Sequence, residues 1–218
     1  MNKPHPSEKI SVMLVDDHAV VRAGYRFLLE SLNDIDVIAE ATSGEQAVAE
    51  VGQYRPDILV MDLTMPGMGG LEAIRRIREL YPQTRILVFT MHENPAFVEH
   101  VLQTGVAGYI SKNSPPETLV DAIRGIAAGD LFIDAKIAQS MVVRKTRNSG
   151  SQLASLTSRE FQILCLYAEA YSIEDIAKEL SISAKTVSNY LTLIKEKLQV
   201  SNTQELIRLA ISEGLVTV

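Results

Sequence analysis

The sequence predicts an α/β domain, built on a doubly wound five-stranded parallel sheet, followed by a small all-α domain. Three observations predict this arrangement. From residue 10 to about 128, short apolar runs alternate with amphipathic stretches of helical length, as is typical of parallel α/β folds. After Asp134 the strand pattern stops. From Leu156 onward only helix-start signals remain.

The α/β pattern gives five strands and five helices. The apolar runs that predict strands are Ile10–Val15, Val37–Ala39, Ile58–Met61, Ile86–Phe89 and Gly108–Ile110. The stretches that predict helices are 19–31, 44–53, 70–80, 95–103 and 116–127. The strand order 2-1-3-4-5 is typical of one doubly wound class. In that order the first and third strands are neighbours at the switch point, where ligands bind.

Four helix starts predict the all-α part. Thr157 and Glu160 have the spacing of a capping box, and Ser172, Ser183 and Asn202 are typical N-caps. We therefore divide the chain into a disordered tail (1–9), an α/β domain (10–130), a linker with a short helix at 135–145 (131–152), and a four-helix domain (153–218).

Composition narrows the class of protein. Hydrophobic residues make up 46% of the 218, enough for a real core, and the net charge is -6. The single cysteine, Cys165, lies in an apolar run and predicts inert packing in a reducing compartment. Neither a signal peptide nor a run of about 20 apolar residues is visible. We expect a cytoplasmic protein without membrane segments.

Three carboxylates predict a cation site. Asp16 and Asp17 follow the first strand, and Asp62 follows the third. They should converge at the switch point, where they repel one another unless a cation joins them. We expect Asp16, Asp17 and Asp62 to hold Mg²⁺, with the backbone carbonyl of Thr64 as a further ligand. Asp62 is the candidate nucleophile, because a carboxylate can accept a phosphoryl group.

Two later strands also end in polar groups. Thr90 follows the fourth strand and Lys112 the fifth, where a hydroxyl and an ammonium can bind phosphoryl oxygens. The loop after the third strand contains Pro66, Gly67 and two further glycines, which favour a tight turn over the site. His18, His92 and His100 lack partners at zinc-ligand spacing, and we interpret them as surface or capping residues.

The stretch Ser183–Gln199 predicts a helix with a single apolar stripe, formed by Val187, Leu191, Ile194 and Leu198. A second amphipathic helix precedes it across a short turn, which predicts a helix-turn-helix. The alternative is a bundle that serves dimerisation only. Residues 151–218 contain six basic and eight acidic residues, a net charge of −2 that is unusual for a DNA-binding domain.

Residues 10–128 resemble a response-regulator receiver domain. The matching residues are Asp16-Asp17, Asp62 with Met65-Pro66-Gly67, Thr90, Gly108-Tyr109 and Lys112; Asp16-Asp17-His18 with Arg22 and Gly24 further resembles the NarL/FixJ subgroup. The resemblance implies that a partner sensor histidine kinase phosphorylates Asp62. It also implies a switch in which Thr90 moves towards the phosphoryl group and Tyr109 swings inward.

The carboxy-terminal part resembles a LuxR-type helix-turn-helix, through Leu156–Glu160, Ile176–Leu180, Ser183–Tyr190 and Ile194–Leu198. The resemblance implies binding to double-stranded promoter DNA. The family positions that touch bases fall on Ser188, Asn189 and Thr192. Lys185, Lys195 and Lys197 would contact phosphates, and Thr186 is a further DNA-binding position. We expect a transcriptional regulator that dimerises on phosphorylation and is not a turnover enzyme. RNA polymerase is a candidate further partner.

Four departures from these families stand out. Met91 replaces the usual small residue after Thr90, which would slow access to the site, and Asn113 replaces a common proline. Glu174-Asp175 replaces basic or neutral residues, and Ala170-Tyr171 a common glycine. Two rivals also stay open. One is a phosphohydrolase, although Thr64 is not the second acid that such an enzyme normally has, and the other is a phosphorylation-independent scaffold.

Overall fold

The structure, a computed structural model, describes residues 9–145 and 152–216. The expected disordered tail lies outside the described residues except for Lys9, as does the polar part of the linker at 146–151. Within the described residues, no helix has both the length and the apolar character needed to cross a membrane.

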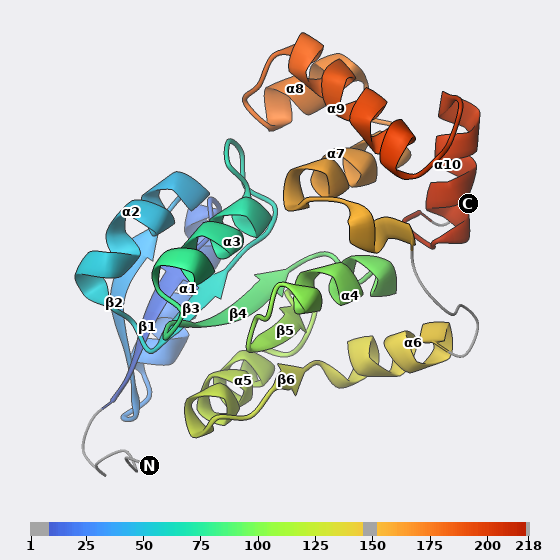
Figure 1. Cartoon of the computed structure of the whole chain (residues 1–218). Helices are drawn as coiled ribbons and strands as arrows, with labels where there is room; N and C mark the ends of the chain where they lie inside the picture. Colours follow the sequence, from blue (N-terminus) through green and yellow to red (C-terminus); the bar gives the residue numbers. More distant parts are fainter. Residues whose placement is uncertain (1–8, 146–151, 217–218) are drawn as a thin grey trace.

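The amino-terminal domain is a parallel sheet flanked by helices, as predicted (Figure 1). The strands are β1 (Ile10–Val15), β2 (Ile35–Ala41), β3 (Ile58–Met61), β4 (Arg85–Thr90), β5 (Gly108–Ser111) and β6 (Phe132–Ile133). The helices are α1 (Ala19–Glu30), α2 (Gly44–Tyr54), α3 (Gly70–Leu80), α4 (Pro95–Gln103), α5 (Pro116–Ala128) and α6 (Ala135–Lys145).

The sheet has six strands in the order β2-β1-β3-β4-β5-β6, one more than predicted. The extra strand, β6, pairs Phe132 with Gly108 and Ile133 with Tyr109. We had assigned these residues to the linker because two residues are too few for a periodic pattern to be visible. The predicted order of the other five strands is confirmed.

Side chains alternate between the two faces of the sheet. Met13, Met61 and Val88 pack with α2, α3 and α4, whereas Leu14 and Val60 pack with α1 and α5 on the other face. Because both faces are covered, the central strand β3 is apolar and buried along its whole length. This burial leaves the strand ends as the place where polar side chains can gather.

The carboxy-terminal domain is all-α, as predicted. It consists of a 3₁₀ turn (Gln152–Ser155) and helices α7 (Ser158–Ala168), α8 (Ile173–Glu179), α9 (Ala184–Lys197) and α10 (Thr203–Ser212). All four predicted caps are confirmed: Thr157, Ser172, Ser183 and Asn202 each accept a hydrogen bond from the backbone N–H three residues later. Each such cap contributes about 1 kcal/mol to stability.

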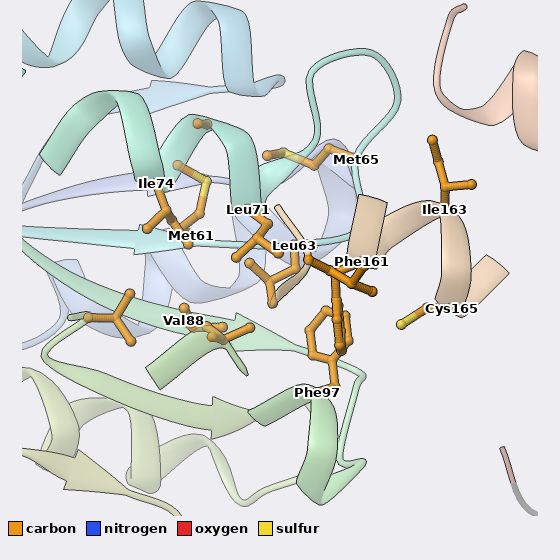
Figure 2. Close-up of a cluster of buried hydrophobic side chains, with 14 of the residues drawn as sticks. Met61, Leu63, Met65, Leu71, Ile74, Val88, Phe97, Phe161, Ile163 and Cys165 are labelled. Carbon is orange, nitrogen blue, oxygen red and sulfur yellow. The ribbon is translucent and has the colours of Figure 1, made fainter. Parts of the chain in front are cut away.

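Helix α7 lies between the amino-terminal domain and helices α8 to α10 (Figure 1). Phe161 of α7 is fully buried, and its ring centroid lies 5.5 Å from that of Phe97 on α4 (Figure 2). The ring of His100, also on α4, lies 4.0 Å from that of Phe161. Arg159 donates to the carbonyl of Gly67 at 3.2 Å and to that of Leu180 at 2.9 Å. We call the contacts of Phe161 with α4, and of Arg159 with Gly67, the seam.

Candidate functional site

The carboxyl ends of β1, β3, β4 and β5 bring the predicted site residues together. Asp62 N–H donates to the carbonyl of Val15 at 2.9 Å, which places Asp62 beside the end of β1. Lys112 N–H donates to the carbonyl of Thr90 at 2.9 Å, which aligns the ends of β4 and β5 in the same way. The ladder between neighbouring strands therefore sets the relative positions of Asp62, Thr90 and Lys112.

The loop after β3 is tight, as predicted. Gly67 and Gly69 have φ angles of 81° and 70°, in the left-handed region that favours glycine. A Cβ at Gly70 would lie 2.0 Å from the carbonyl oxygen of Asp62, so a side chain at this position would collide with the backbone of the candidate acceptor. Glycine is thus required where α3 begins directly behind Asp62.

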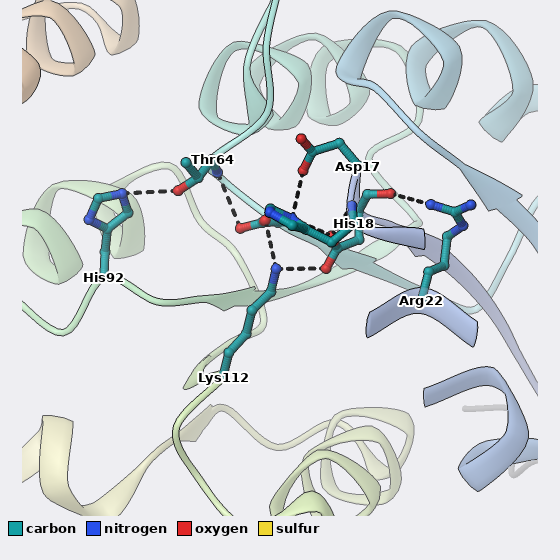
Figure 3. A network of polar contacts seen from close by, with 8 residues as sticks. Asp17, His18, Arg22, Thr64, His92 and Lys112 are labelled. Atoms are coloured by element: carbon teal, nitrogen blue, oxygen red, sulfur yellow. Dashed lines mark hydrogen bonds and ion pairs between the residues drawn. The ribbon is translucent and has the colours of Figure 1, made fainter. Parts of the chain in front are cut away.

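Lys112 joins two of the three carboxylates. Its Nζ lies 2.7 Å from Asp62 Oδ2 and 2.6 Å from Asp16 Oδ2 (Figure 3). Burial raises the pKa of the Asp62 carboxyl, and the Lys112 ammonium opposes that rise. Burial also lowers the pKa of Lys112, but Asp62 and Asp16 together outweigh it and the net pKa is raised. Lys112 therefore stays protonated and supplies a positive charge at the site.

Two buried oxygens at these strand ends, Thr90 Oγ1 and Asp17 Oδ1, take part in no hydrogen bond within the described residues. Buried polar atoms normally have partners, and each exception calls for an explanation, such as a water, an ion or a ligand. A phosphoryl oxygen would satisfy the Thr90 hydroxyl, and a cation would satisfy the Asp17 carboxylate. Asp16, Asp17 and Asp62, with His18, form a group of potential ligand atoms within 4.8 Å of one another.

Asp16, Asp17, Asp62, Thr90 and Lys112 thus lie at the carboxyl ends of neighbouring strands. Thr64 is adjacent, and its N–H donates to Asp62 Oδ1 at 3.2 Å. Tyr109 is fully buried, with its hydroxyl donating to the carbonyl of His92 at 2.8 Å. Of the departures from the family pattern, Asn113 donates to Glu93 at 3.0 Å, and the Met91 side chain is exposed.

The interpretation of the histidines as surface or capping residues is wrong for two of the three. The half-buried His92 bonds Thr64 Oγ1 through Nε2 at 3.1 Å and stacks on Phe97, while His100 stacks on Phe161 in the seam. Both partners are distant in the sequence, so local spacing gave no signal for them. His18 is largely exposed, but its Nδ1 lies against Asp16 and Asp17 (Figure 3).

Cys165 is buried, and its burial raises the pKa of the thiol far above its usual range. An un-ionised thiol without access to solvent is unreactive. The predicted role of Cys165 in core packing is confirmed, and it takes no part in the site.

Helices α8 and α9 have the predicted helix-turn-helix arrangement. Val187, Leu191, Ile194 and Leu198 are buried, whereas Lys185, Ser188, Asn189 and Thr192 are exposed. Thr186 and Lys195 are half-buried. Lys197 differs from the other lysines, because its Nζ pairs with the buried carboxylate of Glu160 at 2.7 Å. The exposed polar face of α9 is available to a ligand, and Lys197 anchors α9 to α7.

Comparison with known proteins identifies both halves. Residues 12–124 match the response regulator receiver domain, and residues 154–210 match the bacterial regulatory proteins of the luxR family. The oxygen regulatory protein NreC of Staphylococcus carnosus is 39% identical over 215 residues, which cover 95% of this chain and 99% of that protein. The transcriptional activator protein ExaE of Pseudomonas putida is 40% identical over 213 residues, with coverage of 96% and 99%.

The fold also matches solved structures. RcsB of Salmonella enterica serovar Typhimurium, bound to the promoter rprA in the presence of the phosphomimetic BeF3⁻, aligns with a TM-score of 0.67 and 27% identity, over 93% of this chain and 98% of that one. A structure of two RcsB dimers bound to two parallel DNAs aligns with a TM-score of 0.63 and 27% identity, over 94% and 99%. The chain therefore belongs to the response regulators that join a receiver domain to a LuxR-type helix-turn-helix domain, a family of DNA-binding transcriptional regulators rather than turnover enzymes.

Proposed function

We propose that Asp62 accepts a phosphoryl group from the phosphohistidine of a partner sensor kinase. The P–N bond of the phosphohistidine breaks, a P–O bond forms to a carboxylate oxygen of Asp62, and the released imidazole takes up a proton. The product on Asp62 is an acyl phosphate. The observation that carries this proposal is the placement of the Lys112 ammonium, 2.7 Å from Asp62, at the strand ends where the Thr90 hydroxyl has no hydrogen-bond partner within the described residues.

The surrounding residues have separate roles in this proposal. Asp16, Asp17 and Asp62, with the Thr64 carbonyl, would hold Mg²⁺, which supplies neutralising charge for the phosphoryl oxygens. Asp17 Oδ1, which takes part in no hydrogen bond within the described residues, fits such a cation. Lys112 turns from the carboxylates to a phosphoryl oxygen, and the Thr90 hydroxyl donates to another. The Thr90 side chain thereby moves, and Tyr109 responds because β4 and β5 pair along Val88–Tyr109 and Thr90–Ser111.

A labelling experiment tests the acceptor. We expect full-length protein with Mg²⁺ and a small acyl-phosphate donor to gain about one phosphoryl group per chain, the stoichiometry of a single nucleophilic carboxylate. Asp62→Asn should not be labelled. The matched control is Asp57→Asn, which alters an exposed carboxylate that accepts from Ser11 outside the pocket. Stoichiometric labelling of Asp62→Asn would refute the assignment.

We further propose that the exposed face of α9 enters the major groove of promoter DNA. Asn189 is suited to bidentate pairing with adenine, Thr192 to contact with a thymine methyl, and Ser188 to either base edge. Lys185 and Lys195, with Thr186, would contact phosphates. A phosphate contact by Lys197 would require its ion pair with Glu160 to break, so we assign Lys197 a structural role.

The seam supports a coupling between the two domains. Arg159 joins the carbonyl of Gly67, five residues after Asp62, to that of Leu180, directly before the helix-turn-helix turn. A cleft of about 1010 Å³ lies between α3 and the face of α9 that carries Thr186 and Tyr190. We propose that phosphorylation loosens the seam and frees α9 to align on DNA.

Dimerisation completes the proposed switch. Val20 and Phe27 on α1 are 87% and 79% exposed, with the uncrowded Gly24 between them on the same helix. We propose that a second copy covers this face on phosphorylation, as the dimeric assembly of RcsB on DNA suggests.

A cytoplasmic location follows from the proposed kinase and DNA partners, and RNA polymerase stays a candidate partner. We retain domain limits at 10–130 and 153–218, with the linker adding β6 to the sheet.

A further inference from the structure

We propose that His18 is a further ligand of the cation site and shifts the preference of that site from Mg²⁺ towards divalent transition-metal ions, of which Mn²⁺ and Co²⁺ are the probes. The inference rests on the cation site proposed above. It concerns a side chain that composition and spacing assign to the protein surface.

The local backbone aims the imidazole at the carboxylates. His18 N–H donates to Asp16 Oδ1 at 2.8 Å, which turns the chain sharply where α1 begins. The His18 side chain makes no capping hydrogen bond to α1. It lies instead against the acids, as Figure 3 shows. The turn thus fixes a third donor group beside two carboxylates.

The spacing of these donors is that of neighbouring metal ligands. His18 Nδ1 lies 3.0 Å from Asp17 Oδ1 and 3.2 Å from Asp16 Oδ1. In an octahedral site with bonds of about 2.1 Å, adjacent ligands are about 3.0 Å apart and opposite ligands about 4.2 Å. The whole group of ligand atoms, Asp62 included, lies within 4.8 Å. A small contraction of this group would bring the nitrogen and the oxygens around one ion.

The charge distribution leaves room for a cation on this side. Lys112 contacts Asp16 and Asp62 through their Oδ2 atoms, and so does not neutralise Asp17. Asp17 Oδ1 is buried and takes part in no hydrogen bond within the described residues, although His18 Nδ1 is 3.0 Å away. His18 Nδ1 has its hydrogen-bond partner in Asp16 Oδ1, at 3.2 Å, and a cation bound between these atoms would take the place of that bond. The rival arrangement is a protonated His18 that serves as the counter-ion itself.

An imidazole ligand changes which metal the site favours. Mg²⁺ strongly prefers oxygen ligands and keeps several waters, whereas imidazole nitrogen binds transition-metal ions well. The His18 side chain is 61% exposed, which leaves Nε2 free to carry its proton into solvent while Nδ1 offers its lone pair. Replacing one water by this nitrogen would favour Co²⁺ and Mn²⁺ over Mg²⁺.

Pulsed electron paramagnetic resonance of Mn²⁺ bound to the full-length protein tests the inference. We expect the ¹⁴N coupling of one directly bound imidazole, which His18→Gln abolishes. Glutamine can still donate a hydrogen bond to Asp16, so this variant separates a metal ligand from a donor. His100→Gln is the matched control, because it removes a histidine of the seam and should leave the coupling intact.

Calorimetric titration gives the second readout. His18→Gln should weaken Co²⁺ binding by about tenfold or more, and Mg²⁺ binding by a smaller factor. Bound Mn²⁺ without ¹⁴N coupling, or equal losses for Co²⁺ and Mg²⁺, would overturn the role of His18 and leave the phosphoacceptor proposal standing. Failure of the wild-type chain to bind either metal, together with no labelling of Asp62, would overturn both.

Discussion

At the scale of single residues, two buried hydroxyls on neighbouring strands differ in what they do. Ser111 Oγ donates to Glu93 at 2.6 Å, whereas Thr90 Oγ1 has no partner within the described residues. Lys136 and Asn113 also bond Glu93, and the bonds from Lys136, Ser111 and Asn113 lower the pKa of that carboxyl to about 2. Ser111 therefore stabilises the fold, whereas the proposed role of Thr90 is to bind a phosphoryl oxygen.

Substitution of the two hydroxyls should separate stability from switching. Thr90→Val should leave the free energy of unfolding unchanged or raise it by up to about 1 kcal/mol, because no hydrogen bond is lost. Ser111→Ala, the control, should lower it by about 1–3 kcal/mol, because Glu93 loses a donor. Urea denaturation measures both. In Thr90→Val, phosphorylated protein should no longer dimerise, and a loss of stability matching that of Ser111→Ala would contradict our interpretation.

At the scale of secondary-structure elements, α9 carries the proposed DNA contacts on one face. Asn189→Ala should weaken binding to a selected promoter site by about 1–3 kcal/mol and relax base preference at one position. Lys185→Ala should weaken binding to all sequences alike and reduce the salt dependence by about one counterion. Fluorescence anisotropy at several salt concentrations distinguishes the two. Equal effects of Asn189→Ala on selected and random DNA would refute the base contact.

The stack of His100 on Phe161 in the seam predicts that the docking of the two domains depends on pH. Burial lowers the pKa of His100 to about 4. Since the unfolded or undocked histidine has a pKa of about 6.5, the stacking contributes its full stability above that pH and loses it as the pH falls towards 4. The radius of gyration, measured by small-angle X-ray scattering, should therefore increase below about pH 6.

His100→Phe is the matched variant for this prediction. A phenyl ring can stack on Phe161 in place of the imidazole, which lies at an interplanar angle of 6°, and it carries no proton at any pH. The variant should stay docked as the pH falls, whereas wild type opens. Opening of both proteins at the same pH would show that another group controls the seam.

At the scale of the whole molecule, the sequence predicts what repeats locally and misses what joins distant segments. The strands ending in Asp16, Asp62 and Thr90 were predictable because apolar runs and helical stretches alternate along the chain. The bond between Thr64 and His92 and the stack of His100 on Phe161 were not, because packing between elements 28 and 61 residues apart leaves no local pattern. Strand β6 was too short to detect.

The seam joins the domain that carries the proposed phosphoacceptor, Asp62, to the domain that carries the proposed DNA-reading helix, α9. A coupling of about 1–3 kcal/mol between the two sites would change DNA affinity by about 5- to 150-fold. Thermodynamic reciprocity requires DNA to favour the phosphorylated state by the same factor. The account therefore depends on whether occupation of the Asp62 pocket alters α9.

The most direct test is the affinity of the full-length protein for a site obtained by unbiased DNA selection, measured with and without beryllofluoride and Mg²⁺. We predict binding tighter by at least about fivefold with beryllofluoride, and no such gain in Asp62→Asn. Equal affinity in the two conditions, with beryllofluoride shown to be bound, would contradict the account, as would the same gain in Asp62→Asn.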